Sequence, residues 1–232
     1  MKIIEVLVSG FEKTFIRDDR YLIFLQGIGN TLLIALFATL MGVLLGTIVA
    51  VIKVLNKQTG KLKILAAIGE VYSTVIRGTP VVVQLLIAFN IIFSFSNHPV
   101  IVGILTFGFN SGAYVSEIMR GGILAVDIGQ TEAGRSLGLS GGTTMFKIVF
   151  PQALKTVLPA IGNEFISLLK ETSVIGYLGV VDLTRAAERV ISRTAEVYFP
   201  YISIALIYLA LVLGLSAVFK KLEKRLAKSD RS

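Results

Sequence analysis

Two long runs without a charged residue constrain this chain more than any other feature. They cover residues 28–52 and 197–219, which are 25 and 23 residues long. A helix needs about 20 apolar residues to cross about 30 Å of hydrocarbon. The chain is 54% hydrophobic, above the roughly 45–50% of a soluble domain. We therefore predict an all-α membrane protein.

Three further segments have the length of a membrane span but carry charged residues. They cover residues 64–95, 99–126 and 143–170. Residues 1–20 mix acids and bases without a short apolar core, unlike a signal peptide. We find no linker rich in proline or serine. The sequence thus predicts five membrane-spanning helices in one domain, residues 1–232.

The basic residues predict the orientation of these helices. Lysines at positions 53, 57, 61 and 63 follow the first span without any acid, and six basic residues follow Phe219 against Glu223 and Asp230. Positively charged segments stay in the cytoplasm. With five crossings, the N-terminus lies outside, and residues 127–142 and the C-terminus lie in the cytoplasm.

Composition also excludes several classes of function. The net charge is +8, but the basic residues stand at the ends of apolar runs instead of forming one patch, so we expect no nucleic-acid partner. The absence of cysteine excludes disulfides, thiolate metal sites and cysteine nucleophiles. His98 is the only histidine and precedes Pro99 in an expected solvated turn. We expect neither a metal site nor catalytic residues.

A polar, glycine-bearing segment, residues 129–142, separates the third and fourth predicted spans. Thr131 is a candidate N-cap, with Glu132 in the first helical turn, where the helix dipole favours an acid. Thr143 is expected to cap the next span. An ordinary helix and turn with generic caps is the alternative interpretation.

The same segment has features suited to docking. Ala133, Leu137 and Ser140 are expected on one helix face, where they form a small apolar knob. Gly138 allows the backbone to take a positive φ at the end of the helix. A cytoplasmic segment of this kind can dock a soluble partner.

The order Glu132-Ala133-Gly134, then Gly138, Ile148 and Pro151, resembles the EAA motif of ABC-importer permeases, the loop that engages the ATPase. The whole chain resembles the transmembrane permease subunits of polar amino-acid importers of the histidine, arginine, lysine and glutamine type. The pieces that carry this resemblance are residues 29–32, 77–80, 112–123, 129–133, 151–154, 159–165, 169–173 and 180–183. Gly134 replaces a second alanine, which we expect to loosen the docking helix slightly.

The resemblance implies a type I ABC-importer permease fold in the bacterial inner membrane. It implies alternating access, a cytoplasmic ABC ATPase dimer that binds ATP and Mg²⁺, a second permease subunit that is identical or closely related, and an extracytoplasmic solute-binding protein. The chain has no phosphate-binding G-x-x-x-x-G-K-[ST] motif, so we expect it to bind no cofactor and to act as a transporter subunit rather than an enzyme. The residues that it implies for ATPase coupling are Glu132, Ala133, Gly134, Leu137, Gly138 and Leu139.

Polar residues inside the predicted spans suggest where an amino acid passes, because ionisable groups in a membrane usually face a partner or an aqueous cavity. Glu117 and Glu164 suit a cationic amino acid, with Arg77 for its carboxylate. The full set of candidate substrate-binding residues is Asn110, Tyr114, Glu117, Asn163, Glu164, Ser167, Arg77 and Gln84. Alternatively, these charges pair with each other and with Arg120, Lys155 or Lys170.

Three further predictions concern the shape and the position of helices. Pro80, between Arg77 and Gln84, should kink the second span. Residues 182–190 predict an amphipathic external helix capped by Asp182, and residues 2–15 an interfacial helix.

Two alternative functions are a proton-coupled carrier, with Glu117 and Glu164 as proton relays, and a membrane scaffold. We see no internal duplication that favours a carrier, which also has no use for a docking loop.

Overall fold

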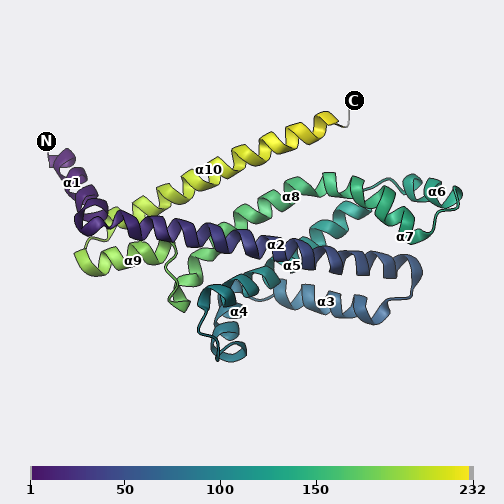
Figure 1. Cartoon of the computed structure of the whole chain (residues 1–232), viewed down its shortest axis with the longest axis horizontal. Helices are drawn as coiled ribbons and strands as arrows, with labels where there is room; N and C mark the ends of the chain where they lie inside the picture. Colours follow the sequence, from purple (N-terminus) through teal and green to yellow (C-terminus); the bar gives the residue numbers. More distant parts are fainter. Residues whose placement is uncertain (1, 230–232) are drawn as a thin grey trace. The chain divides into compact units, whose positions relative to one another are not determined.

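The computed structural model describes the backbone of residues 2–229 and the side chains of residues 5–225, and this part of the chain contains helices and turns but no strand. Figure 1 shows the helices in chain order. Their bounds are α1 Lys2–Phe11, α2 Tyr21–Thr59, α3 Lys63–Arg77, α4 Val81–Ile87, α5 Pro99–Leu124, α6 Ile128–Ser136, α7 Gly141–Thr144, α8 Phe150–Glu171, α9 Leu183–Thr194 and α10 Tyr198–Ser229. Short π-helical turns follow α1, α4 and α7, and 3₁₀ turns precede α2 and α9.

Three of these helices are long and apolar enough to cross a membrane: α2, α5 and residues Tyr198–Arg225 of α10. A fourth candidate is a broken one. Helix α3 and the segment Val81–Ile92 meet at an angle of 106°. The expectation of a kink at Pro80 was therefore too mild, and a single continuous helix over residues 64–95 is wrong. Pro80 lacks an N–H and disfavours helical backbone at the residue before it, so α3 does not continue through it and ends at Arg77.

The fourth predicted span, residues 143–170, is helical but less apolar. It consists of α7, a π-helical turn at Met145–Val149, and α8. It is not among the helices whose length and composition alone qualify them as spans. The prediction of five crossings therefore stays a prediction.

The described helices fold as two compact units. The first contains residues 2–38, 81–107 and 166–215, and the second contains residues 39–80, 108–165 and 216–229. Helices α2, α5, α8 and α10 each contribute residues to both units.

The first unit has two apolar clusters. One is built around fully buried Leu85, Phe107 and Leu168. The other lies under α9, where Leu183 and Val190 are buried. The predicted amphipathic helix is confirmed, as is its cap.

The Asp182 carboxylate at the start of α9 accepts hydrogen bonds from the backbone N–H groups of Thr184 and Arg185, both at 3.0 Å. Burial raises the pKa of this carboxyl above its usual value, while those hydrogen bonds oppose the shift. Arg185 and Arg189 are exposed on the other face of α9. The cap thus fixes the start of a helix that has one buried face and one solvent-exposed face.

In the second unit, α2 and α5 approach so closely that glycine is required. A Cβ atom on Gly46 would lie 2.7 Å from the backbone oxygen of Gly112 and 2.7 Å from the backbone nitrogen of Ser116. One turn earlier, a Cβ on Gly42 would lie 2.8 Å from the Cβ of Ser111. Small residues at helix contacts are typical of membrane proteins, where backbone packing drives helix association.

Replacing Gly46 with valine should therefore destabilise the second unit. Forcing side-chain atoms into a filled site costs about 1–3 kcal/mol, and more where backbone atoms must move. Gly121 of α5 has open space around its Cβ position and provides the matched control. Thermal unfolding of both valine variants in detergent measures the difference, and equal melting temperatures would contradict the close contact.

Candidate functional site

A network of charges joins three helices of the second unit. Lys53 was expected in a cytoplasmic loop, but it lies within α2 with a side chain only 7% exposed. Its Nζ is 2.8 Å from a carboxylate oxygen of Glu70 in α3 and 2.8 Å from one of Glu117 in α5. It also donates a hydrogen bond of 3.1 Å to Ser73. Lys53 therefore lies within α2 and not in a loop, so the loop prediction is wrong for this residue.

Glu117 is shared between two cations. One carboxylate oxygen faces Lys53, and the other accepts two hydrogen bonds from Arg120, at 3.0 and 2.8 Å. The side chain of Glu117 is 22% exposed. The sequence allowed either substrate binding or ion pairing for Glu117. The structure shows an ion pair with Arg120. A substrate cation would have to compete with two existing partners.

Helix α3 lies along α5 through further polar contacts. The hydroxyls of Ser73 and Ser116 are 3.1 Å apart, and the Tyr72 hydroxyl donates to the backbone oxygen of Phe109 at 2.6 Å. The Arg77 guanidinium lies over the ring of Tyr114, 5.6 Å from its centre. A cation in this position is attracted by the negative face of the ring. The structure thus brings two of the candidate substrate-binding residues together.

A second pair joins α5 to α8. The Ser111 hydroxyl donates a hydrogen bond of 3.0 Å to the Glu164 carboxylate, and Asn110 beside it is buried. Asn163 is exposed, because neighbouring helical residues point about 100° apart. Sequence reasoning missed Ser111, although it directly follows the candidate residue Asn110 in the sequence.

The remaining two candidates belong to the first unit. Gln84 lies in α4 and Ser167 in α8, and both are half-buried. Within the described part of the chain, no group of three or more His, Asp or Glu side chains comes close enough together to hold a metal ion.

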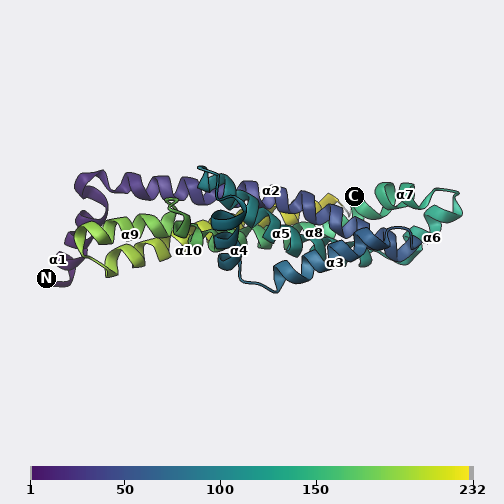
Figure 2. The same cartoon turned by 90° about the horizontal axis from the view of Figure 1, so that it is seen from below.

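The candidate docking segment consists of α6 and α7, which lie side by side in Figures 1 and 2. Helix α6 begins earlier than expected: its N-cap is Asp127, whose carboxylate accepts from the N–H of Gly129 at 2.7 Å, and the assignment to Thr131 is wrong. Ser140 caps α7 by accepting from the N–H of Thr143, so Thr143 is not the cap.

The turn between these two helices has the predicted backbone. Gly138 has a φ of +79°, which confirms the positive φ expected there. The N–H of Leu139 reaches back to the oxygen of Gly134 at 3.1 Å. Ala133 and Leu137 are exposed, Leu137 by 80%. Ser140 lies outside α6, so it does not extend the same helical face.

Gly134 has a packing role that the sequence did not predict. It is buried, and a Cβ there would lie 2.7 Å from Cγ2 of Thr144 and 3.0 Å from Cδ1 of Ile148. Alanine at this position would require those side chains to move. Glycine therefore lets α6 sit directly on the π-helical turn that leads into α8.

Comparisons with known proteins show which family the chain is related to. Residues 42–228 match the family model described as "Binding-protein-dependent transport system inner membrane component". The chain is 35% identical over 210 residues to the "Putative glutamine transport system permease protein GlnP" of Rickettsia typhi, covering 89% of this chain and 94% of the relative. It is also 35% identical over 209 residues to the "Arginine transport system permease protein ArtQ" of Bacillus subtilis, covering 89% and 93% of the two chains.

Two solved structures extend the comparison. An amino acid ABC transporter crystallised with histidines has a chain that is 40% identical, with a TM-score of 0.80 over 88% of this chain and 94% of the other. The inward-facing methionine transporter MetNI has a chain with a TM-score of 0.75 at 16% identity, covering 91% and 99% of the two chains, which shows a shared fold alone.

Proposed function

The chain belongs to the family of binding-protein-dependent transport system inner membrane components, as a permease subunit of an amino-acid ABC importer, and we propose that it forms the translocation pathway for a cationic amino acid by alternating access. It is a multi-pass membrane protein and not an enzyme, since ATP is hydrolysed by a separate subunit in such systems. The family does not favour a proton-coupled carrier.

The observation that carries the substrate proposal is the half-buried Glu164 carboxylate between α8 and α5, held by Ser111. An ionisable residue inside a membrane domain is costly unless it serves a partner or a pathway. Glu164 then binds the substrate's side-chain cation, and Arg77 its carboxylate. Asn110, Tyr114 and Asn163, which belong to the same unit, line the same route. Glu117, already engaged by two cations, holds α2 and α5 in place beside it.

The membrane topology follows from the charges. Five crossings, with the bent pair α3 and Val81–Ile92 as one of them, place the N-terminus outside and the C-terminus in the cytoplasm. Lys57, Lys61 and Lys63 still flank the turn between α2 and α3 without an acid, and such turns stay in the cytoplasm. Helices α6 and α7 then lie on the cytoplasmic side.

There, α6 and α7 contact the cytoplasmic ATPase dimer, which binds ATP and Mg²⁺. The match of residues 42–228 to the permease family and the Glu132-Ala133-Gly134 sequence support this assignment, and Leu137 is exposed on the segment. Glu132, Ala133, Gly134, Gly138 and Leu139 shape the same surface. A second permease subunit, either a copy of this chain or a close paralogue, and an extracytoplasmic solute-binding protein complete the importer.

Replacing Glu164 with glutamine tests the substrate site. A charge-assisted hydrogen bond is worth about 1.5–3 kcal/mol, so uptake at low arginine or lysine concentration should fall roughly ten- to a hundredfold. The measurement is concentration-dependent uptake by the assembled importer, with thermal melting of the same preparation.

Glu188→Gln, which removes an exposed carboxylate of α9, is the control and should transport like the parent. Should Glu164→Gln lower the melting temperature but leave substrate affinity intact, Glu164 is a packing residue and the substrate site is wrong.

A further inference from the structure

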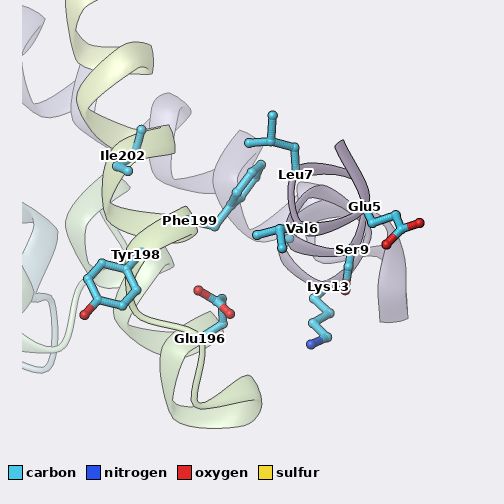
Figure 3. A pocket seen from close by; sticks show the side chains of 10 residues that line it. Glu5, Val6, Leu7, Ser9, Lys13, Glu196, Tyr198, Phe199 and Ile202 are labelled. Carbon is cyan, nitrogen blue, oxygen red and sulfur yellow. The ribbon is translucent and has the colours of Figure 1, made fainter. Parts of the chain in front are cut away.

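A cavity of about 700 Å³ lies in the first unit between α1 and the start of α10. Figure 3 shows its lining: Val6 and Leu7 of α1 approach Phe199 of α10, with Ile202 one turn further along. Gly10 permits this approach, because a Cβ there would lie 2.7 Å from Cδ2 of Phe199. The cavity is a mainly apolar slot between two helices.

The cavity lies where an apolar span begins. Tyr198 is both the first residue of the span Tyr198–Arg225 and part of the lining. Aromatic residues at the end of a span are typical of the headgroup level of a bilayer. On α1, Val6, Leu7 and Phe11 are each more than half exposed. A helix with such a face lies in the membrane interface, so the slot opens at the depth of lipid headgroups.

Two opposite charges, those of Lys13 and Glu196, stand at the mouth of this slot. In Figure 3, Lys13 and Glu196 lie on the two sides of the opening, and Glu5 stands at its outer rim. Among the side chains of residues 5–225, none of these three forms an ion pair. A cation and an anion held apart in one opening are complementary to a ligand that carries both charges.

We propose that this cavity binds a zwitterionic phospholipid with a primary ammonium, of the phosphatidylethanolamine type. Its phosphate faces Lys13, its ammonium donates to Glu196, and one acyl chain lies along Val6, Leu7, Phe199 and Ile202. The two carboxylates and one lysine give the lining a net charge of −1, which disfavours anionic lipids. A trimethylammonium has no N–H to donate to Glu196. The proposal is independent of the transport function.

The test uses the full chain in nanodiscs that contain equal parts of phosphatidylethanolamine, phosphatidylcholine and phosphatidylglycerol. Native mass spectrometry of the released protein counts the lipids that stay bound. The parent should retain the ethanolamine lipid in excess. Since one charge near a bilayer surface is worth about fivefold in affinity, Glu196→Gln should lower the ratio of ethanolamine to glycerol lipid about fivefold.

Two further variants sharpen the result. Lys13→Gln should reduce retention of all phospholipids, because the phosphate is common to them. Glu12→Gln removes a neighbouring carboxylate that does not line the cavity and should change nothing. If Glu196→Gln does not fold, hydrogen exchange of α1 in the parent decides, with stronger protection expected in ethanolamine than in glycerol vesicles.

Several outcomes overturn the proposal. They are retention of choline or glycerol lipid as strongly as ethanolamine lipid, an unchanged ratio in Glu196→Gln, or equal protection of α1 in both vesicles. Retention of no lipid, combined with protection of α1 only in the assembled importer, would make the cavity a protein contact.

Discussion

Replacing Lys53 with methionine should lower the free energy of unfolding by about 3 kcal/mol, because the substitution breaks a buried ion pair. Removing one partner of a buried ion pair typically costs about 3–5 kcal/mol, because the other charge is left uncompensated. Arg120 remains beside Glu117, and Glu70 is 69% exposed, so we expect the lower end of that range. Melting in detergent measures the change.

Two further variants test whether loss of the charge network causes the loss of stability. Lys57→Met lies one turn later on α2, where the side chain is exposed, and should be near neutral. Adding Glu117→Gln to Lys53→Met should restore part of the lost stability, because the half-buried carboxylate is then neutral. Coupling of this kind appears in a double-mutant cycle only between interacting residues. If Lys53→Met melts like Lys57→Met, the charge network does not hold α2 to α5.

Replacing Gly138 with valine should reduce transport by the assembled importer to background, the largest functional effect that we expect. The residue has a φ of +79°, where a side chain costs about 1–2 kcal/mol and a β-branched one more. The turn must then change its path, which moves the exposed Leu137 and the start of α7. Uptake and ATP hydrolysis in proteoliposomes, measured together, show whether the two processes separate.

The control for this turn is Gly121→Val in α5, outside the segment α6 and α7. Gly121 has open space around its Cβ position and no positive φ, so valine there should support transport close to the parent rate. Membrane insertion of Gly138→Val should be normal, because the change lies outside the apolar helices. Parent-level uptake by this variant would refute the coupling role of α6 and α7.

Features determined by local sequence were predicted well. The charge-free runs became parts of α2 and α10, Asp182 caps α9, and Gly138 has a positive φ. In each case, neighbouring residues alone decide the outcome. A long apolar run requires a helix in lipid, and a turn that needs a left-handed residue favours glycine.

Features that depend on tertiary partners were missed. A lysine at the end of an apolar run, such as Lys53, is expected at the membrane surface unless one knows that carboxylates from α3 and α5 meet it. Ser111 becomes informative only once α8 places Glu164 beside it. One usable signal was present: Gly42 and Gly46 are spaced four apart on α2, which is typical of a close helix contact.

The start of α6 shows a different limit. Asp127 and Thr131 are both good N-cap residues, and they stand four residues apart. Local preference alone did not separate them. In the structure the earlier residue is the cap, because the Asp127 carboxylate accepts a hydrogen bond from the N–H of Gly129.

Reconstitution in liposomes shows whether this chain transports only as one subunit of an ATP-driven importer. Amino-acid uptake should be compared between proteoliposomes that contain the chain alone and proteoliposomes that also contain its ATPase, second permease subunit and binding protein. We predict ATP-dependent accumulation by the complete importer, and neither uptake nor ATP hydrolysis by the chain alone, with or without a proton gradient. Gradient-driven uptake by the chain alone would show that it is a secondary carrier and not a subunit of an ATP-driven importer.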